Sequence, residues 1–170
     1  SESNWARLAE CKSDVRRICC DASDDGDVRS SIQALCSDTL HLSGVFHAAH
    51  GLADATLANQ HAHNFRATYG PKVHGASALL VVTRRMPLVF FKVFSSLAGL
   101  MGSAGQASHS AANAWLDAMA CWRRQRGVRG QSINWGVVAQ VGHAARRGVN
   151  RKAEASGLGV VSAETALVAL

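Results

Sequence analysis

The chain has 170 residues, which suffices for one domain with a substantial buried core and is too short for two typical domains. Hydrophobic residues make up 48% and charged residues 18%, a composition that excludes a disordered tail, a collagen-like chain and a coiled coil. The net charge of +6 favours anionic partners in general. Nucleic acid is not expected among them, because the sequence has no basic stripe interleaved with aromatic residues and no zinc-finger or helix-turn-helix spacing.

Membrane and metal-binding classes find no support in the sequence either. No apolar run approaches the roughly 20 residues that a membrane helix needs, and residues 1–10 have no features of a secretion or import signal, so we expect a cytoplasmic setting and no membrane partner. The five cysteines lack paired metal-ligand spacing, and the close histidine pairs have no carboxylate or cysteine neighbour at such spacing. Neither a disulfide framework nor a metal site is therefore predicted.

Short β-branched runs alternate along the chain with longer stretches of helical periodicity, which predicts an α/β domain with a parallel sheet. In chain order we expect a strand over 15–20, a helix over 24–36, a strand over 42–48, a helix over 61–84, a strand over 88–95, a helix over 109–126, a strand over 128–134 and a helix that starts at Ser162.

Two of the expected helices have features of their own. The helix over 61–84 should be interrupted at Gly70-Pro71, where the proline can be the first residue of a second helix. The helix over 109–126 carries small and aromatic residues on one face, and we expect Trp115 and Trp122 to lie in the core. The members of this face are Ala111, Trp115, Ala118 and Trp122.

Polar or small residues follow each expected strand. In a doubly wound sheet, ligands gather at the carboxyl ends of the strands, so these residues are candidates for a site. They are Asp21 and Ala22, then His47, Ala48, Ala49 and His50, then Ser95 and Ser96, and finally Trp135 and Gly136. Lys72 lies on the helix between the second and third strands. His109 follows Ser96 across a glycine-rich loop, and Asn113 lies one helical turn beyond His109.

A set of short segments, in this order and at this spacing, resembles the ketoreductase domain of modular (type I) polyketide synthases, a branch of the short-chain dehydrogenase/reductase family. The resemblance runs from about Val15 to Leu170. The segments that carry it are Gly44–Ala49, Pro71–Val73, Phe94–Gly99, Gly105–Ala107, Ala111–Asp117 and Ser132–Gly136. Each segment alone is weak evidence for the family. Their occurrence together, in the same order and at matching spacing, makes the resemblance specific.

The resemblance implies a Rossmann-like doubly wound parallel sheet and NADPH-dependent reduction of a β-ketoacyl thioester, held on the phosphopantetheine of an acyl carrier protein, in polyketide or related fatty acid synthesis. Lys72, Ser96 and Asn113 match the family's catalytic lysine, serine and asparagine. The implied cofactor contacts are Asp21, Ala22, His47, Ala48, Ala49, Lys72, Trp135 and Gly136. The implied partners are the acyl carrier protein and neighbouring synthase domains.

His109 stands where the family has its proton-donating tyrosine. An imidazole near pKa 6.5 is mostly neutral at neutral pH, whereas a phenol near pKa 10 remains protonated. A nearby Lys72 ammonium further disfavours the imidazolium form. Since the loss of a positioned general acid costs on the order of 10² to 10⁴ in rate, an impaired reductase is expected.

The sequence departs from the family in other places as well. The glycine-rich phosphate loop and the strand before it should precede Val15, and no G-x-G-x-x-G occurs in the chain. We therefore expect residues 1–170 to be a partial catalytic domain that lacks its first strands and binds NADPH weakly by itself. His50 replaces a glycine and should crowd the dinucleotide, and Lys92 lies in a strand covered on both faces, where an unpaired ammonium is costly.

Two alternatives stay open at this point. A catalytically inactive domain could keep the fold in order to organise neighbouring synthase domains. A stand-alone short-chain dehydrogenase for small ketones is the other alternative, and the position of the lysine before the serine argues against it.

Overall fold

The computed structural model describes residues 14–36, 41–138, 159–168 and 170. Its larger sheet has the order β1-β2-β3 with every neighbouring pair parallel, which confirms the predicted parallel α/β architecture. The strands are β1 (Gly44–His47), β2 (Phe90–Ser96) and β3 (Gln131–Trp135). Each lies within or beside an expected strand, with bounds that differ by a few residues because ladder pairing, rather than side-chain type, decides where a strand ends.

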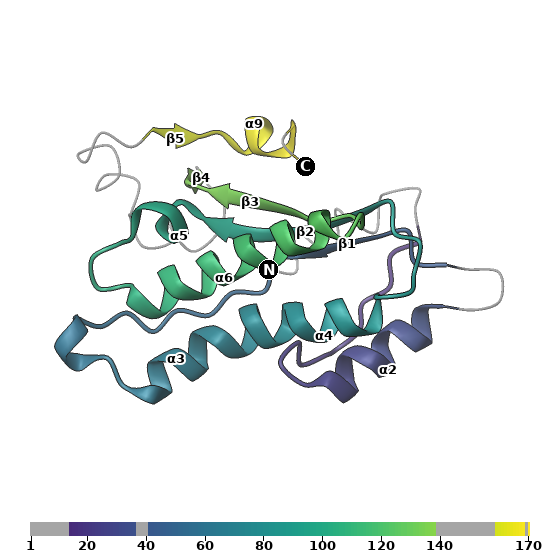
Figure 1. Cartoon of the computed structure of the whole chain (residues 1–170), viewed down its shortest axis with the longest axis horizontal. Coiled ribbons are helices and arrows are strands. Elements are labelled where there is room, and N and C mark those ends of the chain that lie inside the picture. Colours follow the sequence, from purple (N-terminus) through teal and green to yellow (C-terminus); the bar gives the residue numbers. More distant parts are fainter. Residues whose placement is uncertain (1–13, 37–40, 139–158, 169) are drawn as a thin grey trace.

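Four of the helices, α2, α3, α4 and α6, pack on one side of this sheet, and α9 lies on the other side. Figure 1 shows α6 next to the sheet, the α3–α4 rod beyond it, and α2 beside α4. The helical elements that precede β2 are α2 (Asp25–Leu35), η1 (Leu57–Asn59), α3 (Ala62–Tyr69), η2 (Gly70–His74) and α4 (Gly75–Val82). Those that follow β2 are α5 (Leu97–Met101), α6 (Ala107–Gln125) and α9 (Ala163–Val168).

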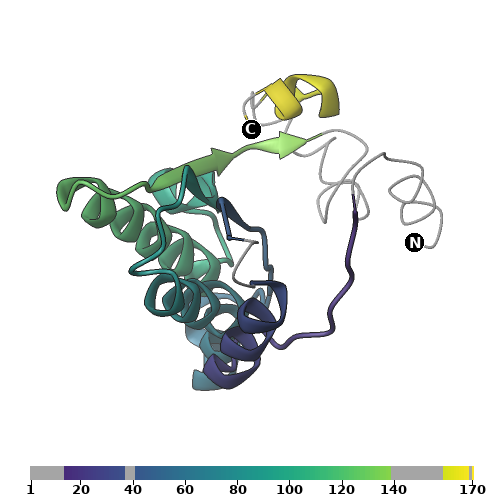
Figure 2. The same ribbon diagram turned by 90° about the vertical axis from the view of Figure 1, so that its right-hand side faces the viewer.

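The expected strand over 15–20 is wrong. These residues have no regular secondary structure and pair with none of the described strands. Figure 2 shows the segment before α2 on a path of its own, apart from β1. A strand exists only where a neighbour accepts and donates its backbone hydrogen bonds, and β-branched residues alone do not supply that neighbour.

The expected interruption at Gly70-Pro71 is confirmed for the α-helix, because α3 ends at Tyr69 and Pro71 lies in the first turn of the next helical element, but that element is a π-helical turn. The chain stays helical from α3 into α4 through the π-helical turn η2, in which the Gly75 amide donates to the Gly70 carbonyl. Pro71 has no N–H to donate, and the wide turn accommodates this loss without ending the helix. Lys72 lies in this turn, and its carbonyl accepts a bond from a side chain of β1, as described below.

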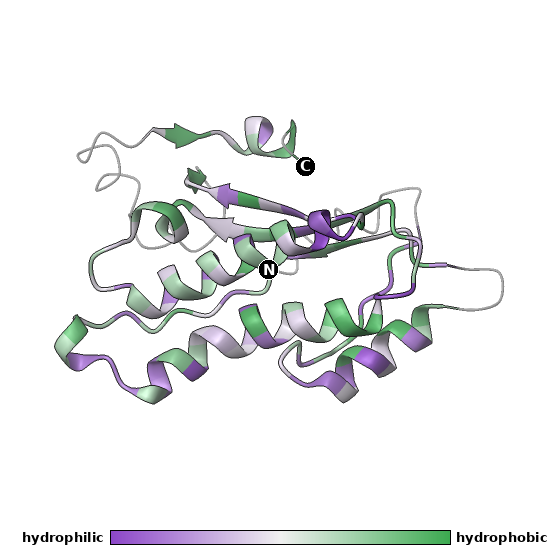
Figure 3. Cartoon of the chain, in the orientation of Figure 1, coloured by the Kyte–Doolittle hydropathy of each residue, from purple (hydrophilic) through white to green (hydrophobic). Residues whose placement is uncertain are grey.

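The core lies between the sheet and the helices. Val45, Phe91 and Val93 point from the strands toward Leu116, Met119 and Ala120 of α6, and all six are buried. The expectation for this helix holds in part. Trp115 is half-buried and packs against this core, whereas Trp122 is 42% exposed, so its predicted place in the core is wrong. Figure 3 shows the C-terminal half of α4 as strongly hydrophobic, in line with its packing between α2 and the sheet.

The opposite face of the sheet is only partly covered within the described residues. Phe46, Phe90 and Phe94 lie along it as a chain of ring contacts, with Phe46 about half exposed. Lys92 shares this face, donates to the Leu170 carbonyl and lies over the Phe46 ring at 5.8 Å. The expectation of an unpaired, doubly covered ammonium is wrong, because the side chain has a carbonyl partner and an aromatic one.

Two short strands near the C-terminus were not expected. β4 (Val137–Val138) pairs in parallel with β5 (Val160–Val161). The final helix follows at once, and the Ser162 hydroxyl accepts a bond of 3.1 Å from the Thr165 amide. The predicted helix start at Ser162 is thus confirmed as an N-cap.

Candidate active site

Lys72 is the centre of the site. Its side chain extends from η2 to the end of β2 and is only 3% exposed. The ammonium Nζ donates to the Phe94 carbonyl at 2.9 Å and to Asn113 Oδ1 at 2.9 Å. Burial lowers the pKa of Lys72 to about 8, and the negative charge of Asp117 partly opposes this shift. The lysine is therefore a cation held mainly by neutral acceptors.

Asn113 connects Lys72 to the helix that carries His109. The amide is fully buried and uses both ends: Oδ1 accepts from Lys72, and Nδ2 donates to the His109 carbonyl at 2.8 Å. The Asn113 carbonyl, in turn, accepts from the Ser95 hydroxyl at 3.2 Å. These bonds fix the start of α6 against the carboxyl end of β2.

His109 lies in the first turn of α6 and is 8% exposed. Its ring meets that of His50, which follows β1, with a centroid distance of 5.6 Å and an interplanar angle of 77°. His50 itself is exposed. A buried imidazole is thus in edge-to-face contact with one that water can reach.

Ser96 ends β2 and begins α5. Its hydroxyl accepts a bond of 3.2 Å from the Ala98 amide and caps that short helix, while its neighbour Ser95 points toward Asn113. Hydrogen bonds therefore join three of the four predicted catalytic residues, Lys72, Asn113 and His109, the last through its backbone carbonyl. Ser96 stands at the same strand end, two residues beyond the Phe94 carbonyl that binds Lys72.

A second layer of polar contacts holds these strand ends. Asp117 accepts from Asn134 Nδ2 at 2.8 Å and from the Ser132 hydroxyl. Asn134 also donates to the Ser96 carbonyl at 3.3 Å. The sequence motifs alone assign no role to Asp117 or Asn134. Their positions in the sequence could have indicated a role, because each lies on an element that also carries a predicted site residue.

The predicted cofactor contacts divide into two groups. His47, at the end of β1, is buried, and its Nε2 lies 3.0 Å from the Lys72 carbonyl; because a carbonyl can only accept, Nε2 carries the proton. Burial lowers the pKa of His47, which favours this neutral form. A Cβ on Gly75 would lie 2.9 Å from the Ala22 carbonyl and 3.0 Å from the His47 ring, so Ala22 and His47 both lie against the start of α4.

The other predicted contacts lie at the ends of β1 and β3 or in the turn before α2. Ala48 and Ala49 directly follow β1, and Trp135 is the register partner of Ser96, with Gly136 next to it. Asp21 is exposed and accepts from the Ser23 amide at 2.8 Å and hydroxyl at 2.7 Å. These bonds lower the pKa of Asp21 and give it a local role in the turn.

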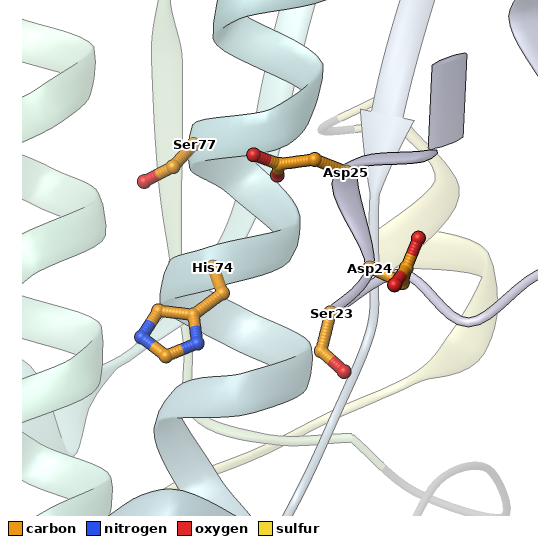
Figure 4. Close-up of a pocket in the computed structure, with 5 residues that line it drawn as sticks. All are labelled: Ser23, Asp24, Asp25, His74 and Ser77. Atoms are coloured by element: carbon orange, nitrogen blue, oxygen red, sulfur yellow. The ribbon is translucent and has the colours of Figure 1, made fainter. Parts of the chain in front are cut away.

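A pocket apart from these residues opens where α2 begins. Figure 4 shows Ser23, Asp24, Asp25, His74 and Ser77 around it, with the His74 ring turned away from the aspartates. None of its lining residues was predicted for the site. Within the ranges that the structure describes, no group of three or more His, Cys, Asp or Glu side chains could hold a metal ion, and no helix is long and apolar enough to cross a membrane.

Comparisons with known proteins agree on one family. The KR domain family matches residues 1–140. The phthioceranic/hydroxyphthioceranic acid synthase of Mycobacterium bovis is 40% identical over 135 residues, which are 79% of this chain and 6% of that protein. Among solved structures, A-type ketoreductases from a modular polyketide synthase superpose with a TM-score of 0.91 at 33% identity, over 99% of this chain and 35% of theirs.

A more distant likeness concerns the fold alone. NAD⁺-bound xylitol dehydrogenase superposes with a TM-score of 0.77 at 19% identity, over 90% of this chain and 62% of that one. The predicted Rossmann-like α/β fold is thus confirmed. The chain spans only 6% of the length of the mycobacterial synthase and about a third of the ketoreductase structures. With the family match covering most of its residues, the chain belongs to the KR domain family, the ketoreductase domains of polyketide synthases.

Proposed function

We propose that residues 1–170 are the catalytic part of a ketoreductase domain within a longer synthase. The reaction is reduction of a β-ketoacyl thioester on an acyl carrier protein to the β-hydroxyacyl form, with NADPH as the hydride donor. The observation that carries the proposal is a pair of hydrogen bonds at the carboxyl ends of the strands. The Asn113 side chain accepts one from the Lys72 ammonium and donates the other to the His109 backbone carbonyl. Neighbouring synthase domains are the other expected partners.

The residues fit the nicotinamide half of the cofactor. An ammonium has three N–H donors, and Lys72 uses two of them on Phe94 and Asn113, so one donor is left for a ribose hydroxyl. The indole Nε1 of Trp135 is buried and has no hydrogen-bond partner among the described residues, which leaves a second donor at the end of β3. The chain has no glycine-rich phosphate loop, so the pyrophosphate contacts would come from elsewhere in the protein.

Each residue then has a defined task. NADPH supplies the hydride when bound. Lys72 holds the ribose, Ser96 offers its hydroxyl to the substrate carbonyl, and His109 occupies the position from which the nascent alkoxide receives its proton. Asn113 fixes Lys72 and the first turn of α6 relative to each other.

One observation favours a second candidate, an inactive domain that keeps the fold to organise its neighbours. His109 is buried beside a lysine-centred site, and burial disfavours the imidazolium that would be a competent acid. A neutral imidazole is a poor proton donor, so the substitution for tyrosine weakens or abolishes turnover.

The test is single-turnover reduction of a carrier-bound β-ketoacyl substrate by the full-length synthase that carries this chain. His109→Tyr should raise the NADPH-dependent rate by on the order of 10²-fold. His63→Tyr, on the exposed side of α3, is the matched control and should leave the rate unchanged. Activity in wild type or in His109→Tyr supports the reductase; no activity in either favours the structural role.

A further inference from the structure

Three acceptors converge on the side-chain nitrogen of Asn134. Asp117 Oδ2 lies 2.8 Å from Nδ2, the Ser96 carbonyl lies 3.3 Å from it and the Ser95 hydroxyl 3.4 Å from it. A carboxylate and a carbonyl can only accept, and Ser95 already donates its proton to the Asn113 carbonyl. Only a donor group satisfies all three, and an amide nitrogen has two N–H donors to share among them. The amide therefore points its nitrogen, not its oxygen, at the end of β2.

Asp117 fixes this orientation of the amide. Its Oδ1 accepts from the Ser132 hydroxyl, while its Oδ2 accepts from Asn134. If the amide turned over, its oxygen would face the carboxylate, and two acceptors would be in contact. The bond to the carboxylate is shorter than the bond to the Ser96 carbonyl, as expected when the acceptor is charged. The second N–H of the amide is thereby directed to the end of β2.

The carbonyl that Asn134 binds belongs to Ser96, the last residue of β2. The Ser96 hydroxyl accepts a bond of 3.2 Å from the Ala98 amide, so its own proton is left for another acceptor. In the proposed reduction that acceptor is the substrate carbonyl. Because the carbonyl and the hydroxyl belong to one residue, a shift of the carbonyl changes the direction in which the O–H points.

The helix that follows Ser96 is closely packed. α5 lies against the start of α6 and the end of β3 (Figure 1). A Cβ on Gly99 would lie 3.0 Å from Asn113 Cβ, and one on Gly136 would lie 3.3 Å from Leu97 Cδ1. The position of Ser96 therefore depends on how β2 and β3 end relative to each other, and the Asn134 amide joins these two ends.

We propose that Asn134 is a positioning residue for Ser96: with its amide oriented by Asp117, it sets the place from which the serine hydroxyl meets the substrate carbonyl. The inference rests on the proposed reduction and adds a residue to it. Both N–H donors of Asn134 are used within the protein, so it acts on the substrate through Ser96. A purely structural link between β3 and α6 would need only the bond to Asp117.

Exchange of the two side chains separates the contact with α6 from the contact with Ser96. In the double variant Asp117→Asn/Asn134→Asp, the amide now on α6 can accept from Ser132 and donate to the carboxylate now on β3. The link between α6 and β3 is thus rebuilt at the same net charge. The carboxylate on β3, however, has no N–H to donate to the Ser96 carbonyl and brings a negative oxygen toward it. The exchanged pair therefore keeps the structural link and loses the bond to Ser96.

The first measurement does not need activity. Amide hydrogen exchange of α5, followed by mass spectrometry in the full-length protein, reports the cap that Ser96 gives this helix. Asn134→Leu, which has a similar shape and no donors, should speed this exchange by on the order of 10-fold, and so should the exchanged pair. Asn59→Leu, at an exposed position, is the matched control and should leave the exchange of α5 unchanged. Unchanged exchange in Asn134→Leu, or wild-type exchange in the exchanged pair, would overturn the proposal.

The second measurement is single-turnover reduction by the full-length protein that carries His109→Tyr, in which proton donation is restored. Asn134→Leu should lower the rate at saturating substrate by about 10-fold and leave the half-saturating substrate concentration within about 2-fold. When Ser96→Ala is also present, the further loss from Asn134→Leu should be less than about 2-fold, because the group that it positions is gone. A merely structural residue would cost the same factor with and without the serine hydroxyl.

The outcomes separate the two proposals. Reduction that survives Asn134→Leu, or that falls by the same factor with and without the Ser96 hydroxyl, overturns the positioning role and leaves the reductase standing. If neither wild type nor His109→Tyr reduces the substrate, the reduction itself is wrong, and the positioning role fails with it even where the exchange of α5 responds.

Discussion

Lys72 and Asn113, separated by 41 positions in the sequence, share a buried hydrogen bond of 2.9 Å between Nζ and Oδ1. The other described partner of the ammonium is the Phe94 carbonyl. Both acceptors are neutral, so the favourable charge acting on Lys72 comes from Asp117 without a direct contact. The site therefore holds a cation whose desolvation is only partly offset, and this has a measurable consequence for stability.

Stability should increase at alkaline pH. Burial lowers the pKa of Lys72 to about 8, while an unfolded lysine has a pKa of about 10.4. Between these values the unfolded chain binds more protons than the folded one, so the free energy of unfolding rises with pH, by up to about 3 kcal/mol across the window. Below pH 8 both states are protonated, and this contribution does not change with pH.

The measurement follows the denaturant midpoint at which Cys121 becomes reactive to a thiol reagent in the full-length protein. Cys121 lies on α6 and is the only cysteine of the tryptic peptide 93–123. The midpoint should move to higher denaturant from about pH 8 to 10 in wild type and in the control Lys92→Met, but not in Lys72→Met. An equal slope in all three proteins would show that Lys72 is not the titrating group.

The corrected core gives a second prediction. Leu116 is fully buried, whereas Trp122 is 42% exposed and stacks on Arg126 at 4.0 Å. Leu116→Ala should lower the free energy of unfolding by about 2–5 kcal/mol, and Trp122→Ala by less than about 1 kcal/mol. The denaturant midpoint of Cys121 reactivity measures both losses of stability. A larger loss for Trp122→Ala would mean that the outward face of α6 is buried against another part of the protein.

The sequence predicts the parallel sheet and the order of its three strands and their intervening helices, because alternation of β-branched and helical segments depends on local patterns. The motif register indicates Lys72, Ser96, His109 and Asn113, and hydrogen bonds in the structure connect Lys72, Asn113 and the His109 backbone. Asp117 and Asn134 lay in the same motifs, but nothing in their spacing indicates that they bind each other.

Features that depend on distant partners could not be predicted. The segment 15–20 has strand-forming residues and no described strand to pair with, so composition misled. The π-turn at Pro71 depends on how η2 packs against β1, and the buried face of α6 depends on where the sheet lies. The His50–His109 contact joins the loop after β1 to the first turn of α6, whose relative position only the fold determines.

Asp117→Asn should reduce stability and shift the titration of Lys72. The carboxylate accepts from Asn134 Nδ2 and from the Ser132 hydroxyl, and an amide presents only one acceptor atom to those two donors. These donors are partly buried, so leaving one of them unsatisfied costs up to about 1–3 kcal/mol. Loss of the negative charge also lowers the pKa of Lys72 further, so the pH-dependent gain in the Cys121 midpoint should begin below about pH 8. Asp25→Asn, on the exposed start of α2, is the matched control. It should change the free energy of unfolding by no more than about 0.5 kcal/mol and should leave the pH at which the Cys121 midpoint begins to rise unchanged. An onset that stays in place in Asp117→Asn would mean that this carboxylate does not act on the lysine.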